Sequence, residues 1–143
     1  MYVETILRKK GDAVVAVEPE CLVSRAAQIL HDNRIGAALV RNAAQKVVGM
    51  LSERDIVRGI ARHKEACLDM TVKELMTSPV ITCAPSDSIE EIMSLMTERR
   101  VRHLPVMDDG ELIGIISIGD VVKQRISEIE HESQALRQYI AAG

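Results

Sequence analysis

The apolar residues of this chain recur in two matched sets at helical spacing. Val23 and Ile89 lie 66 positions apart, and the apolar residues that follow each of them keep the same offsets. The matched positions are Val23, Ala26, Ala27 and Leu30, followed by Ile89, Ile92, Met93 and Met96. Such a stripe forms one face of an amphipathic helix. The pattern therefore predicts one helix of this kind in each half of the chain.

Shorter apolar runs separated by turn residues predict strands. In the first half these runs are 13–17, 35–40 and 47–51, with a polar turn at 42–46. In the second half, runs 101–107 and 112–116 flank Asp108-Asp109-Gly110, and Asp-Gly between apolar runs is a strong hairpin signal. Each half thus reads strand, helix, strand, strand, helix. A further short helix is expected over residues 2–9, ending at Gly11.

A nine-residue motif appears twice, where the last strand of each half meets the last helix. Gly49-Met50-Leu51-Ser52-Glu53-Arg54-Asp55-Ile56-Val57 returns as Gly114-Ile115-Ile116-Ser117-Ile118-Gly119-Asp120-Val121-Val122. A long period repeated only twice indicates a duplicated small domain rather than a solenoid. We predict an α/β (α+β) fold with two such units packed as a pseudo-twofold pair. The repeats span 11–62 and 73–130, with a leading helix at 1–10 and an extension of the last helix at 131–143.

The end of the chain has a different periodicity. Apolar residues follow Asp120 at spacings that alternate between four and three, with Ser133 filling one position. They are Val122, Ile126, Ile129, Leu136 and Ile140. This spacing is typical of a coiled-coil seam. The helix either packs on its own domain or contacts a second copy, and its length favours the second interpretation, a homodimer.

Composition limits the possible partners. The 143 residues carry a net charge of −3 and include two Tyr but no Phe or Trp. The chain therefore lacks aromatic platforms for stacking bases and the basic excess of a DNA-binding protein, so no nucleic-acid partner is expected. No apolar run approaches the ~20 residues of a membrane span, and no signal peptide is evident. Three cysteines without pairing spacing are expected to be reduced, so we predict a cytoplasmic protein without a membrane partner.

Ser52-x-x-Asp55 and Ser117-x-x-Asp120 are the clearest candidates for chemistry, and they permit two interpretations. In the first, Ser caps the following helix and Asp returns a hydrogen bond to the backbone. In the second, the helix N-terminus and the Ser hydroxyl meet a phosphate while Asp accepts from the hydroxyls of a ribose. The second combination suits a nucleotide. The spacing alone leaves both interpretations open. No metal is predicted, because His31, His63 and His131 lack metal-ligand spacing.

With these motifs and Arg102-His103-Leu104-Pro105-Val106, the chain resembles a tandem pair of cystathionine-beta-synthase (CBS) domains, also called a Bateman module, over about residues 11 to 130. The resemblance implies a regulatory module that binds adenosine-containing ligands in clefts between its two halves. The candidate ligands are AMP, ADP, ATP and NAD(H), and S-adenosylmethionine is disfavoured if basic residues face a phosphate. Such pairs commonly form homodimers.

The resemblance also implies roles for individual residues. Asp55 and Asp120 match the ribose-binding position. The positions expected near phosphate or ligand hydroxyls are Ser52, Ser117, Arg54, Arg102 and His103. The backbone near the adenine is expected at Val14, Thr77, Ser78 and Val80. Gly36 and Ala37 stand where the second copy has Arg102 and His103, so the two clefts are expected to differ in affinity or ligand.

Two other functions are kept open. One is a structural dimerisation or partner-binding module without a ligand, and the other is a nucleotide-using enzyme. The enzyme is disfavoured because no nucleophile and base stand out and both G-x-G-x-x-G and P-loop patterns are absent. No catalytic residue is predicted. A sensor would also need a regulated protein as its partner, which the sequence does not identify.

Overall fold

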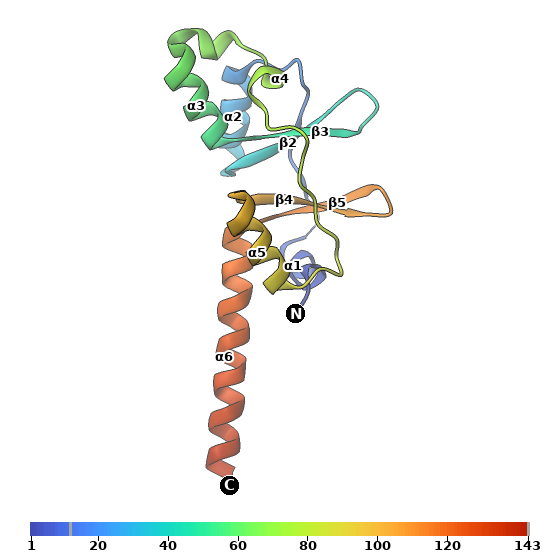
Figure 1. Ribbon diagram of the computed structural model, residues 1–143, viewed down its shortest axis with the longest axis vertical. Coiled ribbons are helices and arrows are strands. Elements are labelled where there is room, and N and C mark those ends of the chain that lie inside the picture. The colour runs from blue at the N-terminus through green and yellow to red at the C-terminus, as the bar shows by residue number, and fades with distance from the viewer. Residues whose placement is uncertain (12, 143) are drawn as a thin grey trace. The chain divides into compact units, whose positions relative to one another are not determined.

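The computed structural model describes residues 1–11 and 13–142. The chain divides into two compact units, of which one is continuous and the other is not. Residues 13–81 form the continuous unit, and the described residues of 1–12 and 82–143 form the split unit. Figure 1 shows the helices and strands of each.

The continuous unit has the predicted order of strand, helix, strand, strand, helix. Its elements are β1 (Ala16–Val17), α2 (Val23–Asn33), β2 (Ala37–Arg41), β3 (Val47–Ser52) and α3 (Glu53–His63). β1 pairs parallel with β2, and β2 pairs antiparallel with β3. The apolar stripe of α2 is buried through Val23, Ala26 and Leu30. It packs into a core that contains Val17, Ala38, Val40, Leu51 and Val72.

The segment after α3 is more ordered than its polar composition indicates. The sequence predicts a linker over residues 62–72 followed by a short helix over 73–76. The short helix is confirmed as α4 (Val72–Leu75), but the predicted linker contains a 3₁₀ helix, η1 (Lys64–Asp69). Cys67 is fully buried, and η1 contacts both α2 and α3. One buried side chain in an otherwise exposed segment is too weak a pattern to reveal such an element.

The split unit contains the second repeat together with the leading helix. Its elements are α1 (Val3–Lys10), α5 (Ile89–Arg99), β4 (His103–Asp108), β5 (Glu111–Ser117) and α6 (Ile118–Ala142). β4 and β5 form the predicted hairpin. Asp109 and Gly110 both have positive φ, at 50° and 78°, as a two-residue type I′ turn requires. The mixed α and β fold class is therefore confirmed.

The first strand of the second repeat is reduced to a single bridge, between Cys83 and Val106. In the continuous unit the corresponding pairing, between β1 and β2, forms a strand of two residues. It includes one more hydrogen bond, in which the Leu39 N–H donates to Val15 O over 3.1 Å. Pro105 occupies the position of Leu39 in the second repeat, and proline has no N–H to donate. One substitution in the repeat therefore accounts for the lost strand.

Each unit contains the helix that precedes the other repeat. α1 joins the split unit through the Tyr2–Ser88 bridge, and α4 is held in the continuous unit by the Leu22–Thr71 bridge. The first residue of each helix, Val3 or Val72, is 0% exposed. The two helices are thus equivalent in packing.

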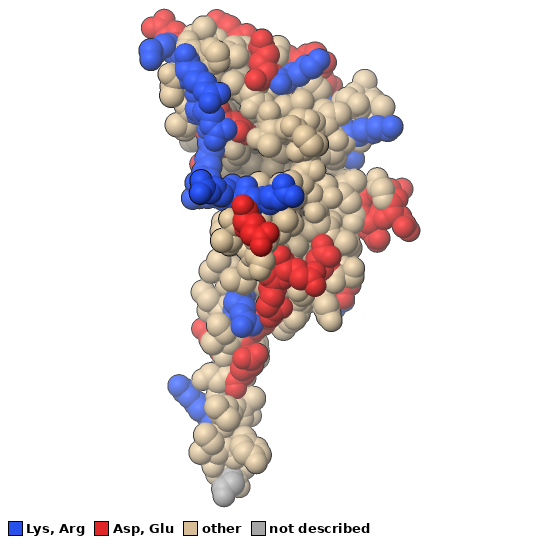
Figure 2. Space-filling view, in the orientation of Figure 1, with Lys and Arg blue, Asp and Glu red and all other residues tan. Residues whose placement is uncertain are grey.

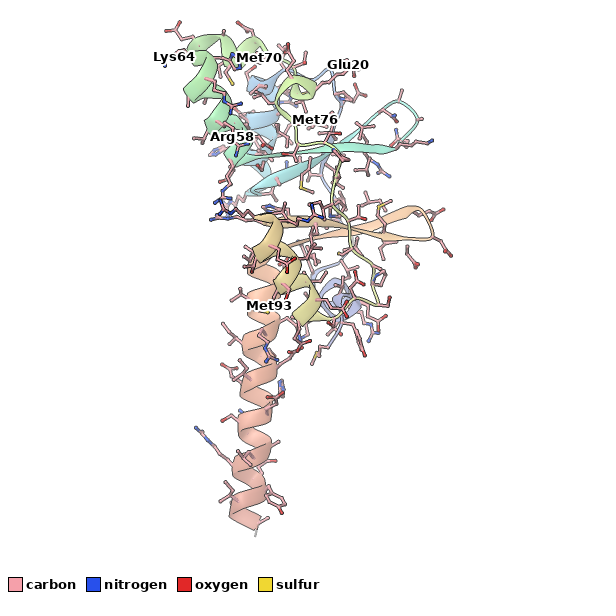
Figure 3. All side chains as sticks on the ribbon, viewed as in Figure 1. Glu20, Arg58, Lys64, Met70, Met76 and Met93 are labelled. Atoms are coloured by element: carbon pink, nitrogen blue, oxygen red, sulfur yellow. The ribbon has the colours of Figure 1, made fainter. Side chains whose placement is uncertain are left out.

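Two glycines permit this packing. A Cβ at Gly49 would lie 2.5 Å from Met76 Sδ, and one at Gly114 would lie 2.6 Å from Leu7 Cδ2. Met76, labelled in Figure 3, directly follows α4, which contacts β3. The glycine that opens each repeated motif therefore makes room for a neighbouring side chain, Met76 just after α4 in one unit and Leu7 of α1 in the other.

The last helix, α6, has 25 residues and extends well past the hairpin and α5 of its own unit (Figure 1). Across the described part of the chain, none of the helices combines the length and the apolar character that crossing a membrane requires.

The position of α1 leads to a stability prediction. Val3→Ala should lower the free energy of unfolding of the split unit by about 1–3 kcal/mol, because it removes two methyl groups from a fully buried site. Denaturant unfolding gives the size of the loss, and amide hydrogen exchange locates it. Val57→Ala is the matched control, because Val57 is 66% exposed on α3. A loss confined to residues 13–81 would contradict the assignment of α1 to the split unit.

Candidate functional site

The first Ser-x-x-Asp motif caps α3. Ser52 Oγ accepts from the Asp55 N–H over 3.3 Å, and Asp55 Oδ2 accepts from the Ser52 N–H over 2.9 Å. This reciprocal pair satisfies two donors that a helix start would otherwise leave unpaired. The structural interpretation of the motif is therefore correct at α3. It does not remove the second interpretation, because the capping bonds also fix a carboxylate at the helix N-terminus.

Further donors surround the Asp55 carboxylate. Thr77 Oγ1 lies 3.2 Å from Asp55 Oδ1, and Arg58 Nη1 lies 3.8 Å from the same oxygen. Asp55 is 6% exposed. Thr77 is itself held by backbone hydrogen bonds to Met50, and Ser78 Oγ donates to Val48 O over 3.0 Å. The structure thus brings Thr77 to Asp55 and attaches Ser78 to β3, but a ribose could reach Asp55 only by displacing existing partners.

The second motif caps α6 in the same way but has a different neighbour. The Ser117 N–H donates to Asp120 Oδ2 over 2.8 Å, and the Asp120 N–H donates to Ser117 Oγ over 3.1 Å. Lys10 Nζ, from α1, also donates to Asp120 Oδ2, over 2.7 Å. Among the described residues, every hydrogen bond shown for this carboxylate ends at Oδ2. Oδ1 therefore has acceptor capacity for a ligand hydroxyl, and the Asp120 side chain is 26% exposed.

Asp120 borders a cavity of about 280 Å³ within the split unit. The lining includes three lysines, namely Lys9, Lys10 and Lys123. Lys9 Nζ donates to Gln124 Oε1 over 3.2 Å, which places its ammonium beside the cavity wall. Three ammonium groups around one carboxylate leave the lining with a net positive charge. The cavity thus combines an acceptor for hydroxyls with positive charge for an anion.

The environment also shifts the pKa of Asp120. Partial burial raises the pKa, but the Lys10 ammonium and the Ser117 donors outweigh burial and hold the pKa of Asp120 below its usual range. Asp120 is therefore ionised at neutral pH, as a hydroxyl acceptor at this position requires.

Arg102 and His103 lie beside the second motif. The Ile118 N–H donates to Arg102 O over 2.8 Å, and His103 is paired with Ser117 across the hairpin. Directly paired residues of neighbouring strands point to the same face of a sheet, so His103 and Ser117 share a face. The side chain of Arg102 is exposed. The structure thus places Arg102 and His103 next to Ser117 at one end of the hairpin.

The other predicted residues are more dispersed. Val14 precedes β1 and Val80 follows Thr77 and Ser78, and both are half-buried in irregular backbone of the continuous unit. Arg54 is exposed on α3 and has no hydrogen bond or ion pair with Ser52 or Asp55 in the part of the chain that the structure describes. It instead starts a row of exposed arginines on α3, with Arg58 and Arg62, and Figure 2 shows basic side chains over this helix.

A wider hollow, of about 780 Å³, lies between α2 and α3. Its walls include Leu30, Ile56 and Val57, but none of the predicted site residues. Size alone does not mark a ligand site, and the smaller cavity is the one whose lining includes a predicted site residue, Asp120. Within the described residues, no three His, Cys, Asp or Glu side chains are grouped so that they could hold a metal ion.

Sequence reasoning missed the lysines. Lys10 lies 110 positions from Asp120, and residues 9 and 10 read as the basic end of a short helix. Nothing in the repeat predicts the contact, because Met76 stands 66 positions after Lys10. Only the packing of α1 on β5 and α6 brings Lys10 to the second motif.

Comparison with known proteins shows the family of this chain. The profile of the CBS domain family matches residues 3–62 and 72–127. The chain is 34% identical over 122 residues to the CBS domain-containing protein CBSX3, mitochondrial, of Arabidopsis thaliana, across 82% of this chain and 59% of that protein. A crystal structure of a CBS-domain containing protein from Agrobacterium tumefaciens is 42% identical with a TM-score of 0.85, and the match covers 87% of this chain and 92% of that one.

A third similar protein was solved with a ligand. It is a CBS domain protein from Pyrobaculum aerophilum in complex with AMP, which is 27% identical with a TM-score of 0.74 over 84% of this chain and 89% of that one. The chain belongs to the CBS domain family, and its two matched segments make it a tandem pair. It spans 59%, 31% and 58% of the length of the first three curated relatives that it matches.

The contact between Lys10 and Asp120 leads to a titration prediction. In Lys10→Met the pKa of Asp120 should rise, because burial would no longer be opposed by the ammonium. Carboxyl NMR titration measures this directly. The lowered pKa stabilises the parent protein above the ordinary aspartate pKa of about 4, and this contribution is lost as the pH falls through the lower folded value. Lys10→Met should lack it.

Lys123→Met is the control for this titration, because Lys123 lines the same cavity without a hydrogen bond to Asp120 among the described residues. An Asp120 pKa that is unchanged in Lys10→Met would show that the ion pair does not set it.

Proposed function

We propose that this chain is a regulatory module that binds an adenosine-containing ligand, with Asp120 as the main ribose acceptor. The observation that carries the proposal is the ionised Asp120 carboxylate at the start of α6, with Oδ1 available and three lysines around the adjoining cavity. AMP, ADP, ATP and NAD(H) all combine a ribose diol with phosphate, so all four are candidates.

Different groups of the cavity would bind the ribose and the phosphate of such a ligand. A carboxylate accepts hydrogen bonds from both hydroxyls of a ribose, while ammonium groups and the positive end of a long helix favour phosphate. Arg102 and His103 lie at the same edge of the hairpin and can add positive charge. The relative that was solved with AMP supports this ligand class.

We propose that the two motifs are unequal. Asp55 is nearly buried, accepts hydrogen bonds from Ser52 and Thr77, and forms an ion pair with Arg58, so a ligand there must replace contacts that the fold uses. Asp120 is more accessible and keeps one oxygen for a ligand. Ser52, Arg54, Val14, Ser78 and Val80 then belong to a weaker site or to a different ligand. Binding measured by calorimetry should accordingly show one dominant event per chain.

Signalling would follow from differential binding. A ligand that binds one arrangement of the module more tightly shifts the population toward it, and a regulated protein would detect that arrangement. We propose the cytoplasm as the location, because the three cysteines are free and a reducing compartment keeps them so.

The test is thermal unfolding with adenosine, AMP, ADP, ATP, NAD, NADH and S-adenosylmethionine. At a hundredfold excess over the dissociation constant, a ligand of the folded state adds about 2.7 kcal/mol, which should raise the midpoint by about 5 °C or more. Adenosine should bind more weakly than the phosphorylated compounds, because it cannot use the lysines. Asp120→Asn should weaken binding by about tenfold to a hundredfold, since a hydrogen bond to a charged acceptor is lost.

Asp55→Asn is the matched variant, because Asp55 has the same capping position in the other unit. It should lower the midpoint of the unliganded protein but keep most of the ligand-dependent rise. A midpoint that no adenosine compound moves would contradict the proposal. A rise that Asp120→Asn leaves intact would exclude Asp120 as the ribose acceptor.

A structural module without a ligand is the second candidate, and the complete capping boxes favour it. They show that Ser-x-x-Asp has a sufficient structural purpose. The two candidates differ in one measurement, since a purely structural motif would make Asp120→Asn destabilising while no nucleotide stabilised the parent.

An enzyme is the least favoured function. Burial raises the pKa of Cys83 to about 12, with the Asp87 carboxylate adding to the shift, so this thiol is a poor nucleophile at neutral pH. Burial likewise raises the pKa of Cys21. We therefore propose binding without chemical conversion, and the same nucleotide should be recovered unchanged after prolonged incubation.

A further inference from the structure

The last turns of α6 have no neighbour within the described chain. Every described residue from Ile129 onward is exposed, although the helix continues to Ala142. A helical segment of this length is marginally stable in water without packing. A partner for this part of α6 would account for its apolar residues.

A row of exposed apolar residues on α6 lies on the side that faces away from its own unit. Val121, Gln124 and Glu128 are buried, whereas Val122, Ile126 and Ile129 are about half exposed. The exposed seam continues through Leu136 and Ile140, at 60% and 68% exposed. At its beginning, Ile118, Gly119 and Val122 line a shallow hollow that prolongs the apolar surface. Figure 2 shows few charged atoms along the protruding end of the helix.

We propose that α6 pairs with α6 of a second copy of this chain as a parallel two-stranded coiled coil. The alternating spacing of four and three places Ile126, Ser133 and Ile140 at position a of the heptad. Val122, Ile129 and Leu136 then occupy position d. The last heptad, with Leu136 at d and Ile140 at a, has the composition that favours two strands, and Ser133, a polar residue at one a position, fixes the register.

The charges that flank the seam select the parallel orientation. In a parallel pair, a residue at g faces the e residue five positions further along the partner. Arg125 would then face Glu130 of the other copy, and Glu132 would face Arg137. Both pairs have opposite charges, and twofold symmetry doubles each of them. Arg125 already contacts Glu90 and Glu128, so Glu132 and Arg137 are the pair on which a test should rest.

The antiparallel alternative has the opposite electrostatics. If the same six seam residues were buried with the helices reversed, e would face e and g would face g. Glu130 would then meet Glu130, Glu132 would meet Glu132, and Lys123 would meet Arg137. All three contacts join like charges, which disfavours this register.

The oligomeric state in solution tests whether the exposed seam of α6 is a dimer contact. Leu136→Asp should weaken dimerisation at least about a hundredfold, because it places a charge in the buried seam of both helices. Gln138→Asp introduces the same residue two positions away, on the outer side of the helix, and should remain dimeric. Sedimentation or light scattering, without nucleotide, gives the result. A monomeric parent protein, or a Leu136→Asp variant that dimerises as the parent does, would overturn the proposal.

Disulfide crosslinking tests the orientation. In a parallel pair, residue 140 of one helix faces residue 140 of the other, so Ile140→Cys should crosslink under mild oxidation. In the antiparallel register the two positions would be about 27 Å apart along the axis, because the pair is centred on residue 131. Gln138→Cys, on the outer side, is the control. A dimeric Ile140→Cys variant that crosslinks no more than this control would reject the parallel arrangement.

A charge reversal tests the proposed partners. Glu132→Arg alone should weaken the dimer about tenfold, and adding Arg137→Glu should restore it, because the pair is reversed but still complementary. An antiparallel pair would not lose affinity on Glu132→Arg, since like charges would face each other both before and after. These outcomes are independent of the ligand, so failure of the dimer and failure of the proposed function would be separately visible.

Discussion

The reciprocal hydrogen bonds between Ser and Asp are the constraint on which the rest of the structure depends. In both units the last strand turns directly into a helix, and that turn leaves backbone N–H groups without partners inside the helix, some of which the Ser and Asp side chains satisfy. The same bonds hold a carboxylate at the positive end of the helix. Capping and ligand binding are therefore not competing explanations. The cap determines where the carboxylate is, and its surroundings determine what else it can contact.

Those surroundings differ although the motif is the same. At α3 a hydroxyl and an arginine of the continuous unit satisfy Asp55, whereas at α6 the lysine of α1 reaches Asp120. A duplication copies the local hydrogen bonds because four adjacent residues encode them. It does not copy the third partner, which comes from the separate segments that hold Thr77 and Lys10. The difference in ligand binding that we propose between the two motifs therefore rests on these segments rather than on the motif itself.

The sequence predicted what short-range patterns encode and failed where distant segments meet. The stripe beginning at Val23 and Ile89, the hairpin turn at Asp109 and Gly110, and the cap at Ser52 all appear as predicted, since each depends on a few neighbouring residues. Pro105 shortened a strand through a missing donor, which could have been read from the repeat. The contact of Lys10 with Asp120 could not, because only the packing of α1 brings them together.

Each unit contains the helix that precedes the other repeat, and this arrangement sets the order in which the units can fold during synthesis. All strands of the continuous unit lie within one stretch of chain, so it can close as soon as residues 13–81 are available. Leu7, by contrast, packs against Gly114, which is made 107 residues later. At ordinary ribosomal rates that delay is roughly 5–20 s. For that interval the apolar side of α1 has no native core, and a nascent chain of this design has a period in which chaperones or a neighbouring chain can bind it first.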